Sequence, residues 1–263
     1  MPTREAAPAG FVHIALDGVD AVCRPRLEAP LRTALTAGTL YDYARSHAAA
    51  RRLTGRAPVF AIPFPDQSQR VVVRHNHHGG AFAPLTGDLF RAPGRAPLEL
   101  AISERLRALD VPTPEFAAYT IYRAAIGLCR SDVATMEIAD SFDLSAALMS
   151  DDAKLREQSW NAALRLVHTL ATAGARHADL NVKNVLLRRR ADATLDALVL
   201  DVDRVELGGS FEQARDANLA RLMRSARKWR DLRGARVTEA ELARVRDAAR
   251  DGDVNVPARA RTP

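Results

Sequence analysis

The 263-residue chain lacks several features that mark other classes of protein. Its two cysteines, Cys23 and Cys129, cannot build a disulfide framework and do not have metal-ligand spacing, so we expect two reduced thiols. It contains no run of about 18 apolar residues, which excludes a helix that spans a bilayer. Residues 1–10 hold one arginine and no apolar stretch, which argues against a secretory signal. Together these absences predict a protein of the cytosol.

Lysine is also scarce, because Lys154, Lys183 and Lys228 are the only lysines among 38 basic residues. The formal net charge of +6 suits a partner rich in phosphate, whether a nucleotide, a nucleic acid or an anionic membrane surface. Charge alone does not choose among these partners. Since no lysine precedes Lys154, any cation that the first half contributes to a phosphate site has to be an arginine.

Residues with catalytic chemistry are concentrated in the run HADLNVKN at 177–184 and in the DVD at 201–203. A kinase-type phosphotransfer site needs an Asp that accepts the proton of the acceptor hydroxyl. It also needs two metal-binding residues, an Asn five positions later and an Asp after the next pair of strands. Asp179, Asn184 and Asp201 occupy these places in that order. Two letters differ from the usual pattern, since Ala178 replaces an Arg and Asp203 replaces a Gly.

The alternative for this run is a solvated loop in which Asp and Asn are ordinary turn residues, since both side chains bond their own backbone in turns. The flanking segments favour the phosphotransfer interpretation. Residues 185–187 and 197–200 each predict a short strand. Asp179 and Asp201 would then lie at strand edges that face one cleft.

Arg74 is the best candidate for the cation that the first half should supply. It ends the predicted strand 70–74, and a guanidinium can bind phosphate oxygens with two parallel hydrogen bonds. The alternative is a strand-end arginine in solvent.

A carboxylate on the following helix would hold this cation in place. The apolar stripe Leu98, Ile102, Leu106 and Leu109 predicts that helix. With a rotation of about 100° per residue, Glu99 borders the buried face and Glu104 points to water. We therefore expect Glu99 to pair with Arg74, the alternative being a first-turn acid favoured by the helix dipole.

The remaining patterns predict a strand-rich first part and a helical second part. Strands are expected at 59–62, 70–74, 119–128 and 133–138, and helices at 143–150, 151–174 and 212–232 and after a capping box at 238–241. Residues 11–50 alternate helical and irregular patterns. In that segment we expect core contacts from Leu31, Leu35, Leu40 and Tyr43.

Three further segments bear on a nucleotide site. Gly55 is a candidate remnant of a loop that covers phosphates. Ile138 ends a predicted strand, and the irregular residues 139–142 after it form the expected hinge whose backbone would meet adenine. The histidines at 75, 77 and 78 have no acid or cysteine at ligand spacing, so we expect a polar, substrate-facing loop and not a metal site.

The expected organisation is a flexible N-terminus at 1–10, an N-terminal lobe with an extension at 11–139, a C-terminal lobe with the 177–184 loop at 140–250, and a disordered tail at 251–263. The expected fold class is α+β.

From about Gly38 to Gly234 the chain resembles the lipopolysaccharide core kinases, and within them the 3-deoxy-D-manno-octulosonic acid (Kdo) kinases. The resemblance rests on short runs in the same order, including an arginine at the position of Arg74. These runs are 73–75 (VRH), 79–80 (GG), 87–88 (GD), 111–114 (VPTP), 177–184 (HADLNVKN), 200–204 (LDVDR) and 218–225 (NLARLMRS).

The resemblance implies a protein-kinase-like fold of two lobes, a small β-rich N-lobe and a mainly helical C-lobe. It implies ATP and Mg²⁺ as cofactors and phosphorylation of the 4-hydroxyl of a Kdo residue on a lipid A precursor. The implied location is the cytoplasmic face of the inner membrane, with peripheral binding to the anionic leaflet, and no nucleic-acid partner is expected. Asp179 would activate the hydroxyl, and Asn184 and Asp201 would hold Mg²⁺. Arg74 would position the phosphates, Glu99 would position Arg74, and Lys183 would touch the γ-phosphate.

Two other functions stay open. One is a kinase of another acceptor, such as a heptose- or aminoglycoside-type phosphotransferase, and the other is a nucleotide-binding pseudokinase. The complete set of Asp179, Asn184 and Asp201 argues against a pseudokinase. The sequence does not give the acceptor sugar or the oligomeric state. It also leaves open whether the basic helix at 212–232 is a solvated charged face or docks to lipid headgroups.

Overall fold

The computed structural model describes residues 7–53, 58–66, 68–77 and 87–251, which belong to two compact units. The first unit contains the chain up to Glu104 together with Pro114–Glu137, and the second contains Arg105–Thr113 and the chain from Ile138 onward. The sequence prediction placed the whole segment up to residue 139 in the N-terminal lobe. Gly55, His78 and the predicted tail beyond Asp251 lie outside the described residues.

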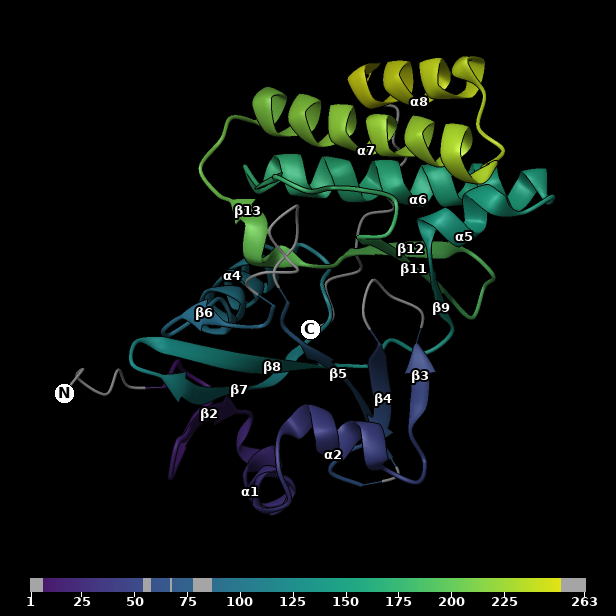
Figure 1. The fold of residues 1–263 in the computed structure, drawn as a ribbon. Coiled ribbons are helices and arrows are strands. Elements are labelled where there is room, and N and C mark those ends of the chain that lie inside the picture. Colours follow the sequence, from purple (N-terminus) through teal and green to yellow (C-terminus); the bar gives the residue numbers. More distant parts are fainter. Residues whose placement is uncertain (1–6, 54–57, 67, 78–86, 252–263) are drawn as a thin grey trace, which may run out of the picture. The chain divides into compact units, whose positions relative to one another are not determined.

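An antiparallel sheet forms the centre of the first unit and contains eight strands among the described residues (Figure 1). The strand order is β1-β2-β7-β8-β5-β4-β3, with β6 paired to β8. The strands are β1 (Val12–Leu16), β2 (Val19–Cys23), β3 (Arg51–Leu53), β4 (Val59–Pro63), β5 (Arg70–His75), β6 (Phe90–Arg91), β7 (Phe116–Ala125) and β8 (Leu128–Met136). Neighbouring residues of each strand point to opposite faces, so both faces of the sheet can carry a core.

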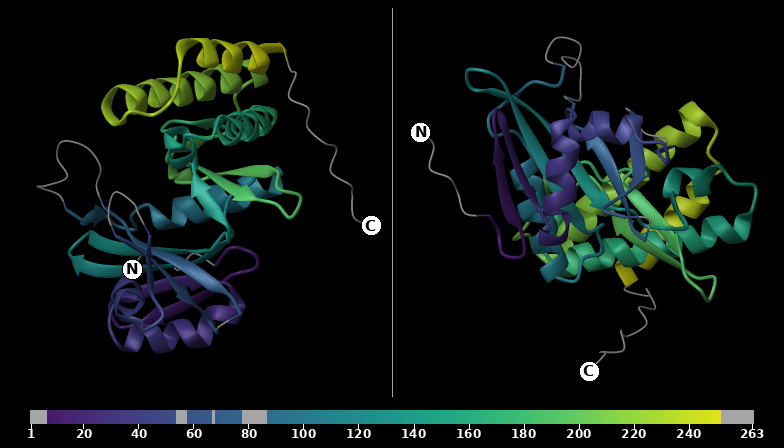
Figure 2. Two further views of the ribbon diagram at one scale, coloured as in Figure 1. Left: turned by 90° about the vertical axis from the view of Figure 1, so that its right-hand side faces the viewer. Right: turned by 90° about the horizontal axis from the view of Figure 1, so that it is seen from below.

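Helices cover both faces of this sheet (Figures 1 and 2). On one face α1 (Glu28–Thr36) and α2 (Leu40–Ser46) pack against Ile14, Ile62 and Val73. On the other, the first turns of α4 (Ala96–Ala108) pack against Phe116 and Val133. Leu31, Leu35 and Leu40 are buried in the first of these cores and Tyr43 is partly buried against it, which confirms the core contacts predicted for residues 11–50.

Two hairpins were missed by the sequence prediction. Strands β1 and β2 lie in the segment predicted as helical and irregular, and Asp17-Gly18 forms the turn between them, with Gly18 at φ +70°. Asp-Gly between short apolar runs is a hairpin signal that could have revealed this pair. The strand predicted at 119–128 in fact turns at Ile126-Gly127 and returns as β8.

The apolar stripe predicted for α4 was wrong in part. Leu98 and Leu109 are 53% and 45% exposed, whereas Leu100 and Leu106 are buried, together with Glu99. The buried face therefore includes a carboxylate, which a search for apolar periodicity does not place inside. Glu104 does not simply point to water, because it accepts a hydrogen bond from Arg24 Nη2 at 2.8 Å.

The second unit combines a small sheet with a stack of helices. Helix α6 lies between the sheet β12-β11-β9 and α7, and α8 packs against both α6 and α7 (Figures 1 and 2). The elements are β9 (Ser141–Asp143), α5 (Leu144–Met149), α6 (Ala153–Thr172), β10 (Arg176–His177), β11 (Val185–Arg189), β12 (Leu195–Val199), β13 (Val205–Glu206), α7 (Phe211–Arg233) and α8 (Glu239–Asp251).

Capping residues explain where the last two helices begin and end. Ser210 and Gln213 form a capping box at the start of α7, and Gly234, at φ +73°, ends it in the left-handed conformation. At α8, Thr238 Oγ1 accepts a hydrogen bond from Glu241 N at 3.1 Å, which agrees with the predicted cap. Within the part of the chain that the structure describes, no helix is long and apolar enough to cross a membrane.

Candidate active site

The hairpin β11–β12 brings the two predicted metal-binding residues together. Asn184 directly precedes β11, and Asp201 follows β12 by two residues. Val185 pairs with Val199 in the ladder, and Leu200 N donates to Asn184 O at 2.9 Å. The chain therefore enters and leaves this hairpin at adjacent points, as the two predicted strands required.

His177 fixes the loop that carries Asp179 to the same point. Its side chain is fully buried, with Nε2 2.9 Å from Leu200 O and Nδ1 3.1 Å from Asp179 N. These contacts require a neutral imidazole that donates from Nε2 and accepts at Nδ1. Burial lowers the pKa of His177, which favours that neutral form. The histidine thus joins the backbone at Asp179 to the end of β12.

The loop itself is held by its own amide side chains. Asn184 Nδ2 donates to Asp179 O at 2.9 Å, and Asn181 Nδ2 donates to the same oxygen at 3.1 Å. The bond from Asn184 uses the nitrogen of its side-chain amide. The oxygen of that amide, Oδ1, is the atom that can accept a bond or bind a cation. Asp179 as a whole is partly exposed, and its Oδ1 accepts from Asn181 Nδ2 at 3.3 Å.

Asp201 occupies an exposed turn immediately after β12. Its backbone is left-handed, with φ 59° and ψ 49°, a region in which Asp and Asn are enriched among non-glycine residues. Within the described residues no group of three or more His, Cys, Asp or Glu side chains could hold a metal ion. An amide oxygen and a carboxylate nevertheless suit Mg²⁺, which prefers oxygen ligands and commonly takes only one or two from the protein, the rest coming from water and phosphate.

Lys183 has two neighbours in the second unit. Its Nζ lies 2.9 Å from Asp143 Oδ2 and 5.4 Å from the centre of the Trp229 ring. Asp143 Oδ1 also accepts from Ala146 N at 2.9 Å and so caps α5. A contact of Lys183 with a γ-phosphate stays a prediction.

In the first unit, Arg74 at the end of β5 forms an ion pair with the buried Glu99 of α4. Arg74 Nη1 also donates to Asn76 Oδ1 at 2.8 Å, so the guanidinium contacts both the helix and the residues after β5. The pairing predicted from the sequence is therefore present.

The adenine contact predicted at Ile138 stays a prediction. The carbonyl oxygen of Ile138 accepts a hydrogen bond from Ser141 Oγ at 2.6 Å.

One face of α7 supplies residues that the sequence analysis did not assign to the site. Asn218 Oδ1 accepts from His177 N at 2.9 Å, Arg221 Nε donates to Ala178 O at 2.9 Å, and Ser225 Oγ accepts from Val182 N at 3.2 Å. Their spacing of three and four residues places them on one side of the helix. A polar stripe on that side was the signal available in the sequence. Each of these side chains binds the backbone of the 175–182 segment.

A phosphotransferase of the protein-kinase type uses the residue types found at Asp179, Asn184 and Asp201 in the second unit. It also uses a cation–carboxylate pair, such as the one that Arg74 and Glu99 form in the first unit. Comparison with known proteins specifies the class further. Residues 56–248 match the model of the family described as "Lipopolysaccharide kinase (Kdo/WaaP) family". The chain therefore belongs to this family, which confirms the predicted family and enzyme class. The sheet of the first unit and the helices of the second confirm the predicted α+β class.

Curated relatives agree with this placement. The chain is 30% identical over 214 residues to a 3-deoxy-D-manno-octulosonic acid kinase of Xylella fastidiosa (strain 9a5c), a match that covers 78% of this chain and 79% of that one. It is 31% identical over 204 residues to the enzyme of the same name from Stenotrophomonas maltophilia (strain K279a), covering 74% and 76%. A solved structure described as "WaaP in complex with acyl carrier protein" is similar with a TM-score of 0.48 and 16% identity, over 86% of this chain and 97% of that chain.

Proposed function

We propose that this protein transfers the γ-phosphoryl group of ATP to the 4-hydroxyl of a Kdo residue in the inner core of lipopolysaccharide. The observation that carries the proposal is the geometry of the second unit, in which His177, Asn184 and the β11–β12 hairpin hold Asp179 beside the chain that carries Asp201. Membership of the lipopolysaccharide kinase family and the names of the relatives support the acceptor.

Asp179 acts as the base in this mechanism. Its carboxylate accepts the proton of the sugar hydroxyl while the hydroxyl oxygen bonds to the γ-phosphorus, and the bond between that phosphorus and the β–γ bridging oxygen breaks to release ADP. Asn184 Oδ1 and the Asp201 carboxylate are the groups that would hold Mg²⁺. The ion, when bound, neutralises charge on the phosphate oxygens. The protein otherwise contributes position and fixed charge.

Arg74 takes the place that a lysine has in most protein-kinase sites. Its guanidinium is permanently charged and would bind the α- and β-phosphates, while Glu99 and Asn76 fix its direction. Gly55, Ile138 and Lys183 complete the proposed nucleotide site.

The decisive experiment replaces Asp179 and identifies the acceptor. The wild-type protein is incubated with γ-labelled ATP, Mg²⁺ and a panel containing Kdo-lipid A, a heptosylated core and free sugars, and the labelled hydroxyl is located by NMR. We expect labelling of Kdo-lipid A at the 4-hydroxyl. Asp179→Asn should lower kcat by about 100-fold or more, because the general base is lost.

Asp192→Asn is the matched control, since Asp192 is an exposed turn residue of the same unit. It should retain wild-type activity. Circular dichroism should show that both variants are folded. Labelling of heptose alone or of an antibiotic alone would replace the Kdo proposal by one of the other acceptor classes, and undiminished transfer by Asp179→Asn would contradict the assigned base.

We also propose that the protein binds the anionic cytoplasmic face of the inner membrane through α7, where its acceptor lipid would lie. Two cations of this helix already have a partner, since Arg227 and Arg230 share the carboxylate of Glu239 at 3.1 and 2.7 Å. Arg224 and Lys228 lie one turn apart and are exposed. They are the residues best placed to meet anionic headgroups.

Sedimentation with vesicles of phosphatidylglycerol and phosphatidylcholine at two salt concentrations tests this docking. Arg224→Ser with Lys228→Ser should weaken binding at low salt by about 30-fold, since each cation near an anionic leaflet contributes about 1 kcal/mol. The matched control is Arg244→Ser with Arg250→Ser, which removes two exposed cations from α8 and should have a small effect. If the two double variants lose vesicle binding equally, net charge explains the effect, and a docking face on α7 is refuted.

A further inference from the structure

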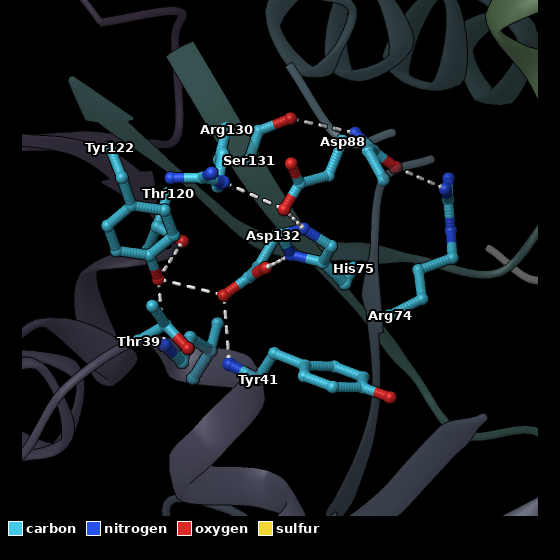
Figure 3. A network of polar contacts seen from close by, with 12 residues as sticks. Thr39, Tyr41, Arg74, His75, Asp88, Thr120, Tyr122, Arg130, Ser131 and Asp132 are labelled. Atoms are coloured by element: carbon cyan, nitrogen blue, oxygen red, sulfur yellow. Dashed lines mark hydrogen bonds and ion pairs between the residues drawn. The ribbon is translucent and has the colours of Figure 1, made fainter. Parts of the chain in front are cut away.

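A buried network of polar side chains lies directly beside Arg74 in the first unit (Figure 3). At its centre the carboxylate of Asp132 on β8 is fully buried. Asp132 Oδ2 accepts hydrogen bonds from Tyr41 N at 2.9 Å and from Tyr122 Oη at 2.8 Å. Its other oxygen lies 2.5 Å from His75 Nδ1. Three donors around one buried carboxylate are the environment of an ionised group, which requires a compensating positive charge.

His75 supplies that charge. Its second ring nitrogen, Nε2, lies 3.0 Å from Asp88 Oδ2, and Asp88 also accepts from Arg130 Nε at 2.8 Å. Both nitrogens of one imidazole therefore face carboxylate oxygens. Only the doubly protonated ring donates from both nitrogens. In a neutral imidazole one nitrogen carries no hydrogen, so it would be an acceptor that faces a carboxylate oxygen, which is also an acceptor.

The groups around His75 act on its pKa in opposing directions. Burial by itself lowers the pKa of His75, but the hydrogen bonds and charges of Asp132 and Asp88 outweigh it and raise the pKa above its ordinary value. His77, whose ring centre is 4.9 Å away, and Tyr41, at 5.7 Å, are the titratable rings that face it. Tyr122 and Arg130 reach it through the two carboxylates.

The position of His75 in the sheet links the network to Arg74. Arg74 and His75 are consecutive on β5, so their side chains leave opposite faces, Arg74 toward Glu99 on α4 and His75 toward Tyr41 on α2. His75 is the last residue of β5 and pairs with Asp132 across the ladder. Its two ion pairs bind the strand end to β8 and to the segment before β6.

We propose that His75, bonded through both ring nitrogens to Asp132 and Asp88, is a positioning residue that fixes the end of β5 and thereby the guanidinium of Arg74 for nucleotide phosphate. This inference rests on the proposed nucleotide-binding role of Arg74. His75 touches neither nucleotide nor acceptor in this proposal, and acts only through the strand that Arg74 shares.

A double-mutant cycle on ATP affinity tests the proposal. The dissociation constant for ATP with Mg²⁺ is measured by calorimetry for the wild type, Arg74→Ala, His75→Gln and the double variant. Loss of the charge-assisted bonds in His75→Gln should weaken ATP binding by about tenfold. In the Arg74→Ala background, His75→Gln should weaken ATP binding by less than about twofold, because the two residues act as one unit.

Two further variants keep the test independent of folding. Asp88→Asn removes the partly exposed carboxylate and leaves Asp132 in place, and it should weaken ATP binding in the same Arg74-dependent way. His13→Gln is the matched control, because His13 lies in the same sheet with a single carboxylate at 3.6 Å, and it should bind ATP as the wild type does. Nitrogen-detected NMR of the His75 ring over a pH series should show both nitrogens protonated to a higher pH than in an ordinary histidine.

The outcomes separate this inference from the proposed function. If the wild type does not bind ATP, or if Arg74→Ala binds it equally well, the proposed nucleotide site is wrong and the inference fails with it. If Arg74→Ala weakens binding but His75→Gln and Asp88→Asn do not, only the positioning role is overturned. Equal losses from His75→Gln with and without Arg74 would likewise overturn it, since they indicate a general structural effect.

Discussion

At the scale of single residues, the surroundings of His177 and of His75 shift the pKa of the two imidazoles in opposite directions. Burial lowers the pKa of His177, whose contacts are a backbone carbonyl and a backbone N–H. His75 is also buried in part, yet two carboxylates raise its pKa. The difference lies in the partners, because a carboxylate stabilises imidazolium and a neutral peptide group does so only weakly.

The raised pKa of His75 predicts a dependence of stability on pH. A base whose pKa is higher in the folded state stabilises fully below its unfolded pKa of about 6.5, and this contribution disappears as pH rises through the folded pKa. We therefore expect the difference in free energy of unfolding between wild type and His75→Gln to be largest near pH 6. This difference should shrink at alkaline pH, because the ring loses its proton there. Each tenfold gain in proton affinity on folding contributes about 1.4 kcal/mol of stability, and it does so only while the ring is charged.

Urea unfolding monitored by circular dichroism between pH 6 and pH 9 measures this difference. His177 contributes in the opposite direction, since a lowered pKa destabilises the folded state as pH falls. It is present in both proteins, so its contribution cancels in the comparison. A constant difference across this pH range would show that His75 does not carry the charge assigned to it.

At the scale of elements, α7 acts as a support for the catalytic loop. The three side chains on its loop-facing side bind the backbone near His177, Ala178 and Val182. The contact of Arg221 with the carbonyl of Ala178 is the most informative, since Ala178 stands where a kinase-type loop usually has an arginine. A guanidinium still reaches this part of the loop, but it comes from a helix 43 residues later in the chain.

Replacing Arg221 should therefore affect the chemical step more than binding. In Arg221→Met the bonds to Ala178 O and Ala217 O are lost. The peptide that precedes Asp179 then keeps the bond from Asp179 N to His177 Nδ1 but loses the one at its carbonyl. We expect kcat to fall by about tenfold and KM for ATP to stay unchanged. A tenfold fall corresponds to the loss of about one charge-assisted hydrogen bond. Steady-state kinetics with ATP and the acceptor measures both constants.

Arg233→Met provides the comparison for that experiment. Arg233 is an exposed cation at the end of the same helix. Its removal changes the net charge equally and should leave both constants at the wild-type value. A fall in kcat with Arg233→Met as large as that with Arg221→Met would attribute the effect to charge and not to the loop contact.

The elements themselves were predictable where a local rule determines them. Apolar periodicity and capping residues predict helices α6 and α7. Short apolar runs predict the strands next to Asn184 and Asp201. The stripe on α4 misled because the buried face contains Glu99, whose charge is compensated by Arg74 from a distant strand. Periodicity of apolar residues cannot detect a buried ion pair.

At the scale of the whole molecule, each of the two units carries its own part of the proposed site. The sheet unit holds Arg74 and Glu99, and the helical unit holds Asp179, Asn184 and Asp201. Both parts were predicted from local sequence, because the spacing of the motif and the ends of predicted strands are properties of short segments. Their roles toward ATP, Mg²⁺ and the acceptor stay predictions for the experiments above.

The sequence by itself determined the enzyme class and predicted the pairing of Arg74 with Glu99, since residue identity and short-range order are enough for these. Only the tertiary structure decided which residues support the site. His75 and Asp132 are 57 positions apart, and Arg221 and Ala178 are 43 apart. Such contacts depend on strand register and helix packing, so His75 looked like one member of a polar loop until the fold placed a carboxylate at each of its nitrogens.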